Sequence, residues 1–302
     1  MRTILKWIGI ILGVLILLVV VIAGALFIRG QMLYNKKYET PAIAVTVPTD
    51  AAAVERGHHL ATVTADCVGC HGPDLGGGVV IDDPALGLIV APNLTTGQNG
   101  IGGQLSDEDI ARVLRYGVKP DGHSVVIMPA DDFTHLTDTD LTSIIAYIRS
   151  VPPVDSSRPA IALKPLPYFL LAAGQLPIVI AERIDFSKVA VPAPITPGPT
   201  AEYGAYIVSI TCQGCHGAGL SGGHIPGTPP DFPKAANLTP SGEVSGWAEA
   251  DFAKAIRTGI TPTGRQLAPE MPWQTFVNLT DDEVSALWQY VHTVPARPAE
   301  TR

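Results

Sequence analysis

The chain has 302 residues, enough for two domains of ordinary size that each bury their own core. Its 20 Lys and Arg residues against 28 Asp and Glu residues give a formal net charge of −8. This acidic balance carries no basic footprint for nucleic acid. Its simplest role is solubility, and the alternative is docking of partners that carry a basic or apolar face.

The first predicted element is an apolar helix that spans a membrane. From Trp7 to Ile28, 22 consecutive residues carry no charge, and as a helix they would rise about 33 Å, roughly the thickness of a bilayer core. Basic residues flank the run on both sides, so the positive-inside rule leaves its orientation open. A cleaved signal peptide is the alternative, because Ala23-Gly24-Ala25 resembles a cleavage site. The apolar run continues past that site, which favours an uncleaved anchor over residues 1–30, followed by a tether over 31–49.

The rest of the chain contains one domain used twice. Residues 50–153 align with residues 200–297 in unchanged order, with spacings that drift by only a few residues. The matching segments are Cys67–Gly72 with Cys212–Gly217, Asn93–Thr95 with Asn237–Thr239, Arg115–Gly117 with Arg257–Gly259, Met128-Pro129 with Met271-Pro272, Leu136–Asp138 with Leu279–Asp281, and Val151-Pro152 with Val294-Pro295. We therefore assign two domains, 50–153 and 200–302, joined by a Pro-rich linker over 154–199.

Each copy is predicted to be mostly helical with long loops. Ser106 and Asp109 form a capping-box-like pair at the start of a middle helix. The last helix of each copy carries apolar residues spaced i, i+3, i+4, i+7 and ends at a proline, which supplies no amide donor. In the first copy we expect a first helix over about 51–63, a middle helix that starts at Ser106, and a last helix capped by Thr137 and Asp140. In the second copy we expect a first helix over about 201–209, a middle helix over about 247–257, and a last helix capped by Thr280 and Glu283.

In each copy, one glycine is predicted to set the packing of the first helix against the last. Gly57 and Gly204 lie in the first helices, while Tyr147 and Tyr290 lie on the last helices. A glycine lets two helices approach closely, so we expect the first and last helices to cross at these positions.

The linker contains an apolar, uncharged segment, Tyr168–Ala181, which is too short to span a bilayer and is interrupted by Pro177. Three interpretations stay open: a helix buried between the domains, a helix at a membrane surface, or an element that binds a partner. Packing between the domains is the simplest of the three. The end of the linker, Val191–Thr200, is predicted to be an extended, semi-rigid spacer.

The four cysteines of the chain occur in two Cys-x-x-Cys-His motifs. In such a motif the two thiols add across the vinyl groups of a haem, and the histidine becomes the proximal ligand of the iron. A redox dithiol would need a βαβ setting, and zinc would need further Cys or His at matched positions; the sequence offers neither. We predict two covalently attached haem c groups. The residues that would hold them are Cys67, Cys70, His71, Cys212, Cys215 and His216.

The predicted second iron ligands are Met128 and Met271. They lie 57 and 55 residues after the histidines of the two motifs, and each is followed by proline. A thioether is a soft, neutral ligand that favours ferrous iron and raises the reduction potential. The alternatives are simple core packing and bis-histidine coordination. The second alternative fails in both copies, because His123 aligns near Arg265, His135 with Asn278, and Arg149 with His292.

Four further residues are candidates for contacts to the haem carboxylates. Arg115 and Arg257 end the middle helices, and a guanidinium suits a propionate. Asn93 and Asn237 could donate to the same groups. The alternative is that these residues are ordinary surface arginines and turn asparagines.

Each repeat resembles a class I cytochrome c domain, on its Cys-x-x-Cys-His, Asn-Leu-Thr and Met-Pro segments. The whole chain resembles the membrane-bound, multi-haem cytochrome c subunits of bacterial alcohol, gluconate and related dehydrogenases, over about two thirds of its length. The resemblance implies an electron-transfer subunit with a single-pass anchor in the cytoplasmic membrane and haem domains on the periplasmic or outer side. Its redox partners would be a dehydrogenase subunit, a respiratory complex or a terminal oxidase. Those subunits commonly carry three haem domains and this chain has two, so the particular partner stays open.

An electron carrier is the leading hypothesis, and it makes the chain a non-catalytic protein. A di-haem peroxidase would need one iron without a strong distal ligand, whereas both repeats offer a matched methionine. A gas sensor or structural haem subunit meets the same objection.

Overall fold

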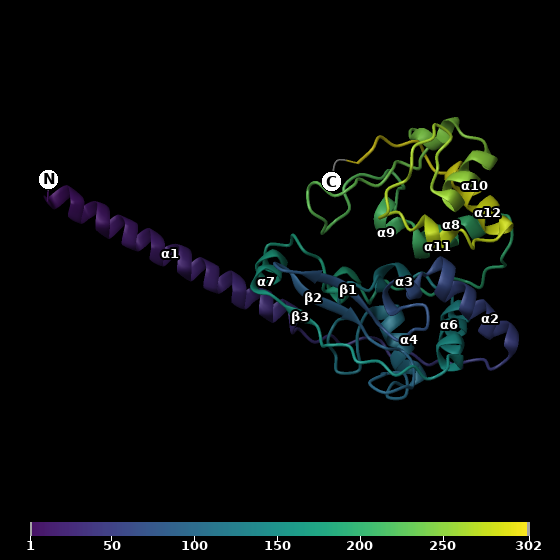
Figure 1. The fold of residues 1–302 in the computed structure, drawn as a ribbon, viewed down its shortest axis with the longest axis horizontal. Helices are drawn as coiled ribbons and strands as arrows, with labels where there is room; N and C mark the ends of the chain where they lie inside the picture. The colour runs from purple at the N-terminus through teal and green to yellow at the C-terminus, as the bar shows by residue number, and fades with distance from the viewer. Residues whose placement is uncertain (1, 301–302) are drawn as a thin grey trace.

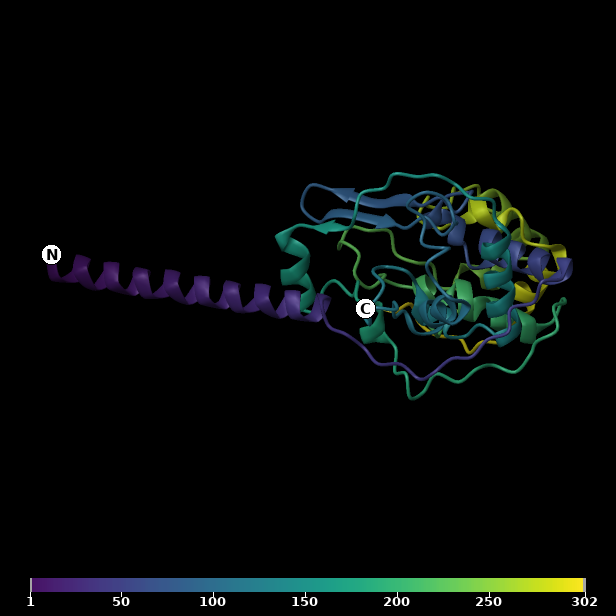
Figure 2. The ribbon, with the colours of Figure 1, turned by 90° about the horizontal axis from the view of Figure 1, so that it is seen from below.

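The computed structural model describes residues 2–300. A long helix, α1 (Arg2–Tyr34), projects from a body in which two helical repeats lie one on the other (Figures 1 and 2). This helix is long and apolar enough to cross a membrane, and its most apolar window is entirely uncovered by the rest of the chain. It continues past the predicted end of the anchor at residue 30, up to Tyr34.

The predicted mostly helical fold is confirmed, and both repeats show the same order of helices. The first repeat contains α2 (Ala51–His59), the π-helix η1 (Leu60–Thr64), α3 (Cys67–His71), β1 (Gly78–Asp83), β2 (Gly87–Ala91), α4 (Asp107–Tyr116), α5 (Ala130–Phe133) and α6 (Asp138–Ser150). The second contains α8 (Ala201–Thr211), α9 (Gln213–His216), the 3-10 helix η3 (Glu243–Gly246), α10 (Glu249–Thr258), α11 (Trp273–Phe276) and α12 (Asp281–Val291). Between them lie β3 (Ala162–Leu163), α7 (Pro165–Ala172) and the 3-10 helix η2 (Ile180–Arg183).

The helix starts follow the capping signals. Ser106 accepts a hydrogen bond from the Asp109 amide, and Asp109 accepts one from the Ser106 amide, so the capping box is confirmed. Thr137 and Thr280 accept from the third amide of α6 and α12 in the same way. The second middle helix begins at Glu249, two residues later than predicted.

The first and last helices of each repeat cross where the glycines predict. A Cβ added at Gly57 would lie 1.8 Å from the Ser143 carbonyl oxygen, and one added at Gly204 would lie 2.0 Å from that of Ala286. Because a side chain cannot fit at either crossing, glycine is required there. The two crossings bury the apolar faces of α6 and α12 in one continuous core.

Two features of the body were not predicted. A small antiparallel sheet of order β1-β2-β3 lies on the first repeat, where the sequence predicted only a long loop. In addition, the first helix of this repeat widens into η1 before the first motif, whereas α8 continues as a regular α-helix. The π-helix accommodates the longer spacing in the first repeat, where Cys67 lies ten positions after Gly57, whereas Cys212 lies eight positions after Gly204.

The helical part of the apolar linker segment does not lie between the repeats, so the simplest of the three interpretations was wrong for it. Instead α7 packs along the C-terminal end of α1 (Figure 1). The end of the segment packs on the first repeat, where Val179 forms a β-bridge with Val126. Pro177 approaches Gly227 of the second repeat.

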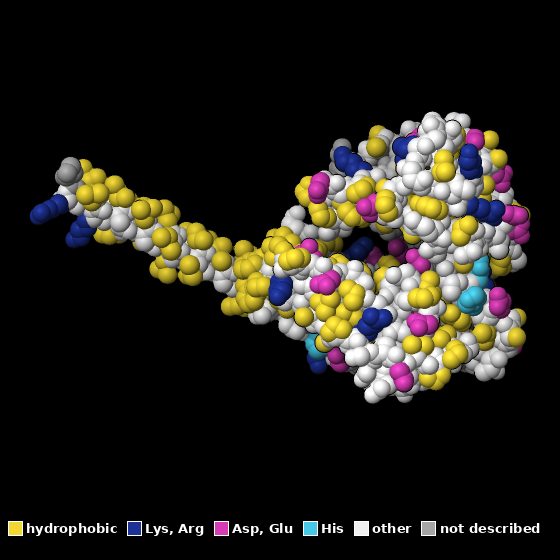
Figure 3. All heavy atoms as spheres, in the orientation of Figure 1, with side chains coloured by type: hydrophobic (Ala, Val, Ile, Leu, Met, Phe, Trp, Pro, Cys, Tyr) yellow, Lys and Arg dark blue, Asp and Glu magenta, His cyan; other side chains and the backbone are white. Residues whose placement is uncertain are grey.

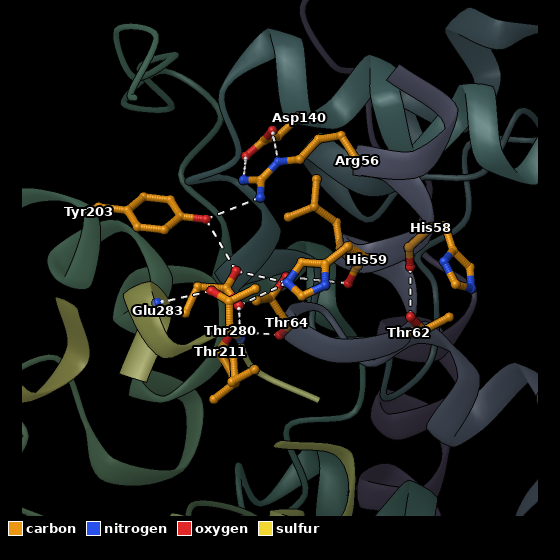
Figure 4. Close-up of polar contacts among 12 residues, drawn as sticks. Arg56, His58, His59, Thr62, Thr64, Asp140, Tyr203, Thr211, Thr280 and Glu283 are labelled. Atoms are coloured by element: carbon orange, nitrogen blue, oxygen red, sulfur yellow. Dashed lines mark hydrogen bonds and ion pairs between the residues drawn. The ribbon is translucent and has the colours of Figure 1, made fainter. Parts of the chain in front are cut away.

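A polar network joins the two repeats (Figure 4). Arg56 donates to both oxygens of the Asp140 carboxylate, at 2.9 and 2.8 Å, and to the Tyr203 hydroxyl of the second repeat at 3.1 Å. The Tyr206 hydroxyl, also of the second repeat, donates to Asp140 at 2.6 Å. Burial and the Asp140 charge raise the pKa of Tyr206, so its hydroxyl remains a donor across the interface.

Candidate functional site

The two Cys-x-x-Cys-His motifs form short helices, α3 and the α9 region, in equivalent places of the two repeats. All four cysteines are free of disulfide bonds. Burial raises the pKa of Cys67 and of Cys212 to about 12, so both are neutral thiols at physiological pH. Because only two residues separate the cysteines of a motif, one helical turn places both sulfurs within reach of the same bound group.

Among the described residues, each motif histidine is held by a hydrogen bond at one ring nitrogen and has no hydrogen-bond partner at the other. Nδ1 of His71 lies 2.8 Å from the Pro92 carbonyl oxygen, and Nδ1 of His216 lies 2.8 Å from that of Ala236. A carbonyl oxygen only accepts, so Nδ1 carries the proton and Nε2 keeps its lone pair. Burial lowers the pKa of both imidazoles, which favours the neutral form that binds a metal.

The loop after each motif has the same backbone path in both repeats. The His71 carbonyl accepts from the Gly77 amide at 2.7 Å, and the His216 carbonyl accepts from the Gly222 amide at 3.0 Å. Leu75 in the first loop and Leu220 in the second both adopt positive φ, 57° and 55°. Both leucines are fully buried, so their packing holds them in a conformation that non-glycine residues rarely adopt. The duplication is therefore one of backbone geometry as well as of sequence.

Met128 and Met271 sit in matching turns. The following prolines have φ and ψ of −78° and 54° at Pro129 and of −78° and 50° at Pro272, which is an inverse γ-turn. The carbonyl of each methionine accepts from the residue after the proline, at 2.8 and 2.7 Å. Both methionine side chains are half-buried and pack against the apolar core that also contacts Cys67 and Cys212. Their role as iron ligands stays a prediction.

The two candidate arginines show a second matched feature. Arg115 is 1% exposed and donates to the Thr134 and Leu136 carbonyls, while Arg257 donates to the Leu279 carbonyl. Each also pairs with the first aspartate of the last helix of its repeat, Asp138 of α6 and Asp281 of α12. Within residues 2–300 the Nε atoms of both arginines are buried without a hydrogen-bond partner. A buried donor left open at the same place in both repeats is a position for an acceptor group.

The two candidate asparagines brace the backbone. Asn93 donates to the Val154 carbonyl at 2.7 Å, and Asn237 donates to the Arg297 carbonyl at 2.8 Å. The Oδ1 atom of each accepts from the threonine two residues later. Each asparagine thus ties the loop after the motif to the chain that leaves the last helix, and its contact to a haem carboxylate stays a prediction.

Each motif helix is covered by the segment that follows the methionine of the other repeat. Thr275 of α11 lies close to Asp66, the residue before α3, and Gln213 of α9 lies close to Asp132 of α5. A Cβ added at Gly214 would lie 2.4 Å from Asp132 Oδ2. Burial, with the charge of Asp131, raises the pKa of Asp132 to about 7. Sequence reasoning missed both aspartates, because their partners lie in the other repeat. The two sites therefore share one interface, and Figure 3 shows a hollow between the repeats.

The residues present fit a covalently held haem. Within residues 2–300 each repeat supplies two free thiols, an imidazole with a free Nε2, a half-buried thioether and a guanidinium whose buried Nε is an open donor. No other common cofactor uses this set at this spacing. The fold and its sites define a c-type cytochrome.

The comparison with known families agrees. The chain belongs to the cytochrome c family described as "Cytochrome C oxidase, cbb3-type, subunit III", which matches it twice, over residues 52–148 and 199–291. The two matches coincide with the two repeats and leave out α1 and most of the linker.

Its relatives are cytochrome c subunits of dehydrogenases, as the resemblance implied. The chain is 32% identical over 275 residues to the fructose dehydrogenase cytochrome subunit of Gluconobacter japonicus, covering 83% of this chain and 55% of the relative. It is 26% identical to the cytochrome c subunit of the quinone-dependent alcohol dehydrogenase of Gluconobacter oxydans, covering 82% and 56%. It is 25% identical to the gluconate 2-dehydrogenase cytochrome c subunit of Pantoea cypripedii, covering 82% and 61%. The chain thus spans little more than half the length of these relatives.

Proposed function

We propose that the chain is a membrane-anchored electron carrier that holds two haem c groups, one in each of the domains 50–153 and 200–302. The observation that supports this most is the duplicated motif helix, in which His71 and His216 have Nδ1 fixed on a carbonyl and Nε2 free. Residues 31–49 would be the tether and residues 154–199 the linker.

The roles of the residues follow from their chemistry. A haem held here would supply a one-electron ferric–ferrous couple. The thiols of Cys67 and Cys70, and of Cys212 and Cys215, would attach it to the chain. His71 and His216 would bind the iron through Nε2, and the hydrogen bond at Nδ1 orients each ring and makes Nε2 more basic.

The remaining candidate residues would complete the coordination of the iron and balance the charge of the haem propionates. Met128 and Met271 would be the second ligands of the two irons, which would leave no place for a substrate and would raise the reduction potential. The open Nε atoms of Arg115 and Arg257 would donate to a propionate, which also offsets the cost of burying them.

Location and partner are inferred from α1 and from the relatives. We infer that α1 crosses the cytoplasmic membrane and that the two repeats lie on its periplasmic or outer side, where haem c is attached. The names of the relatives support a membrane dehydrogenase subunit as the electron donor. A respiratory complex or terminal oxidase would be the acceptor.

A reductive titration of the purified chain tests the carrier function. We expect uptake of two electrons per chain, and no carbon monoxide adduct in the fully reduced protein, because both sixth positions are filled. The ferric protein should show the weak far-red band of iron–thioether ligation and no peroxidase turnover. Carbon monoxide binding or peroxide turnover by the native chain would contradict the carrier and favour an enzyme.

A further inference from the structure

The apolar segment after β3 is the feature that the electron-transfer sites do not use. The 17 residues from Pro165 to Ala181 carry no charge, and their first half forms α7. Leu166 is 42% exposed, and Phe169 and Leu170 are each partly exposed. An uncharged helix with open leucine and phenylalanine side chains needs an apolar environment.

This helix is held tightly against α1. A Cβ added at Gly30 would lie 1.9 Å from the Tyr168 carbonyl oxygen, so the two helices touch through their backbones. Around this crossing the Tyr168 ring lies 5.4 Å from that of Phe27 and 5.8 Å from that of Tyr34, while the Phe169 ring lies 5.6 Å from that of Phe27. On its other side α7 is continuous with β3, which pairs with β2 of the first repeat. The helix therefore connects α1 rigidly to the body.

The distance along α1 gives the depth of the crossing. From Trp7 to Phe27 an α-helix rises about 30 Å, the thickness of the hydrocarbon layer of a bilayer. With Trp7 at one edge of this layer, Phe27 lies at the other, and Tyr34 lies among the headgroups. Tyrosine and tryptophan are enriched at these two boundaries. The crossing with α7 therefore falls at the membrane surface that faces the body.

The surface around the crossing suits lipid. Figure 3 shows that the apolar surface of α1 continues onto the adjoining part of the body. Arg29, next to Gly30 on α1, and Lys164, four residues before Tyr168, are both exposed. Lysine and arginine at this depth can reach anionic headgroups while the chain beside them stays in the acyl region.

We propose that α7 is an interfacial helix whose exposed apolar side, with Leu166 and Leu170, inserts into the outer boundary of the bilayer. This rests on the proposed membrane anchoring of α1. Together α1 and α7 hold the body at two points, so that its height and tilt above the membrane are fixed. A protein partner is the other occupant for this surface, but the depth of the crossing and the continuity with α1 favour lipid.

Spin labels on the full chain in vesicles of phosphatidylethanolamine and phosphatidylglycerol test this. Single cysteines replace Leu166 or Leu170 in α7, Leu15 in the middle of α1 as a lipid reference, or Ala190 in the exposed linker as a water reference. The unsubstituted chain, treated in parallel, reports any labelling of the native thiols. Power saturation compares the access of oxygen, which concentrates in lipid, with that of a water-soluble nickel chelate.

We expect labels at Leu166→Cys and Leu170→Cys to show several-fold lower nickel access than the label at Ala190→Cys, in the same direction as the Leu15→Cys label. If Leu15→Cys is lipid-like while both α7 labels match Ala190→Cys, the interfacial helix is overturned, the anchor stands, and the surface belongs to a protein partner. If the Leu15→Cys label is itself water-accessible, the proposed anchor fails and the interfacial helix fails with it.

Discussion

His59 and Tyr206 occupy the same position in the two repeats, two residues after the crossing glycine, and each reaches a carboxylate of the other repeat. His59 Nε2 lies 2.8 Å from Glu283 of α12, and the Tyr206 hydroxyl lies 2.6 Å from Asp140 of α6. Glu283 and Asp140 are themselves equivalent, each at the third position of the last helix. The contact between the repeats is therefore reciprocal, with a local two-fold relation that also brings α5 onto α8 and α11 onto η1.

The acid sensitivity of this contact can be predicted from Glu283. Burial opposes its ionisation, but hydrogen bonds from His59 and the Thr280 amide outweigh burial, so its pKa in the folded chain is lowered. A lowered folded pKa stabilises the folded state above the unfolded value of about 4.3. That stabilisation is lost as the pH falls through the folded pKa.

Glu283→Gln should therefore lower stability at pH 7, by about 1–3 kcal/mol, and the deficit should shrink below about pH 4. Urea unfolding at several pH values measures this. Asp282→Asn is the matched control, because Asp282 is exposed on the same helical turn. A deficit that is equal at pH 7 and pH 3 would show that Glu283 is not the titrating group.

The helix crossings predict a sharp glycine requirement. Gly204→Ala should destabilise the chain by about 3 kcal/mol or more, because a Cβ there meets the rigid backbone of α12. Gly57→Ala should behave alike. Gly246→Ala is the control, since no atom of residues 2–300 lies within 4 Å of a Cβ at that position, and it should change stability by less than about 0.5 kcal/mol. Thermal unfolding compares the three; equal melting temperatures would contradict the observed crossings.

Haem stoichiometry tests the duplicated sites. The mature chain should carry two haems that survive acid–acetone extraction, measured by the pyridine haemochrome assay. Replacing both Cys212 and Cys215 by serine should leave one, and so should the same change at Cys67 and Cys70. One haem in the unsubstituted chain would refute the duplicated-site interpretation.

The axial methionines can be tested one at a time. Met128→His or Met271→His should lower the potential of one haem only, because imidazole gives iron more electron density than a thioether does. Axial ligands span roughly 0.8 V, so the shift should be large. Met→Ala at either position should instead yield a high-spin haem that binds carbon monoxide. Spectro-electrochemical titration reports both results, and unchanged potentials in both histidine variants would place the sixth ligands elsewhere.

The side of the membrane on which the body lies can be measured separately. Haem c is attached outside the bacterial cytoplasmic membrane, so residues beyond α1 should be exposed there. Protease added to intact spheroplasts should release the haem-containing body, while inverted vesicles should protect it. The opposite pattern would reverse the proposed topology.

The parts of the fold that depend on local signals were predictable from the sequence. Caps at Ser106, Thr137 and Thr280, and the glycine crossings, each rest on residues close together in the chain or on the match between repeats. The bulge at η1 and the sheet of β1, β2 and β3 were not predicted. The first depends on a difference of two residues in spacing. In the second, β1 and β2 form a local hairpin, and only the third strand, Ala162–Leu163, comes from far along the chain.

In the candidate sites, too, features set by local motifs were predictable, whereas features set by residues far along the chain were not. The histidine orientation required the Pro92 and Ala236 carbonyls, which lie 21 and 20 residues away and which no local motif announces. The asparagines proved to be braces for the chain leaving the last helix. Glu283 was recognised as a cap, but its second role at the interface needs the docked repeats, which no pattern within one repeat contains.

The reciprocal contacts of His59 with Glu283 and of Tyr206 with Asp140 also bear on how the chain arose. An interface in which one patch meets its own equivalent is the kind that two identical subunits form as a closed homodimer. A one-domain cytochrome with this patch could have paired with its own copy before its gene was duplicated and fused. On that account the linker inherited an existing association. The divergence of His59 from Tyr206 then became possible once the two partners no longer shared one sequence.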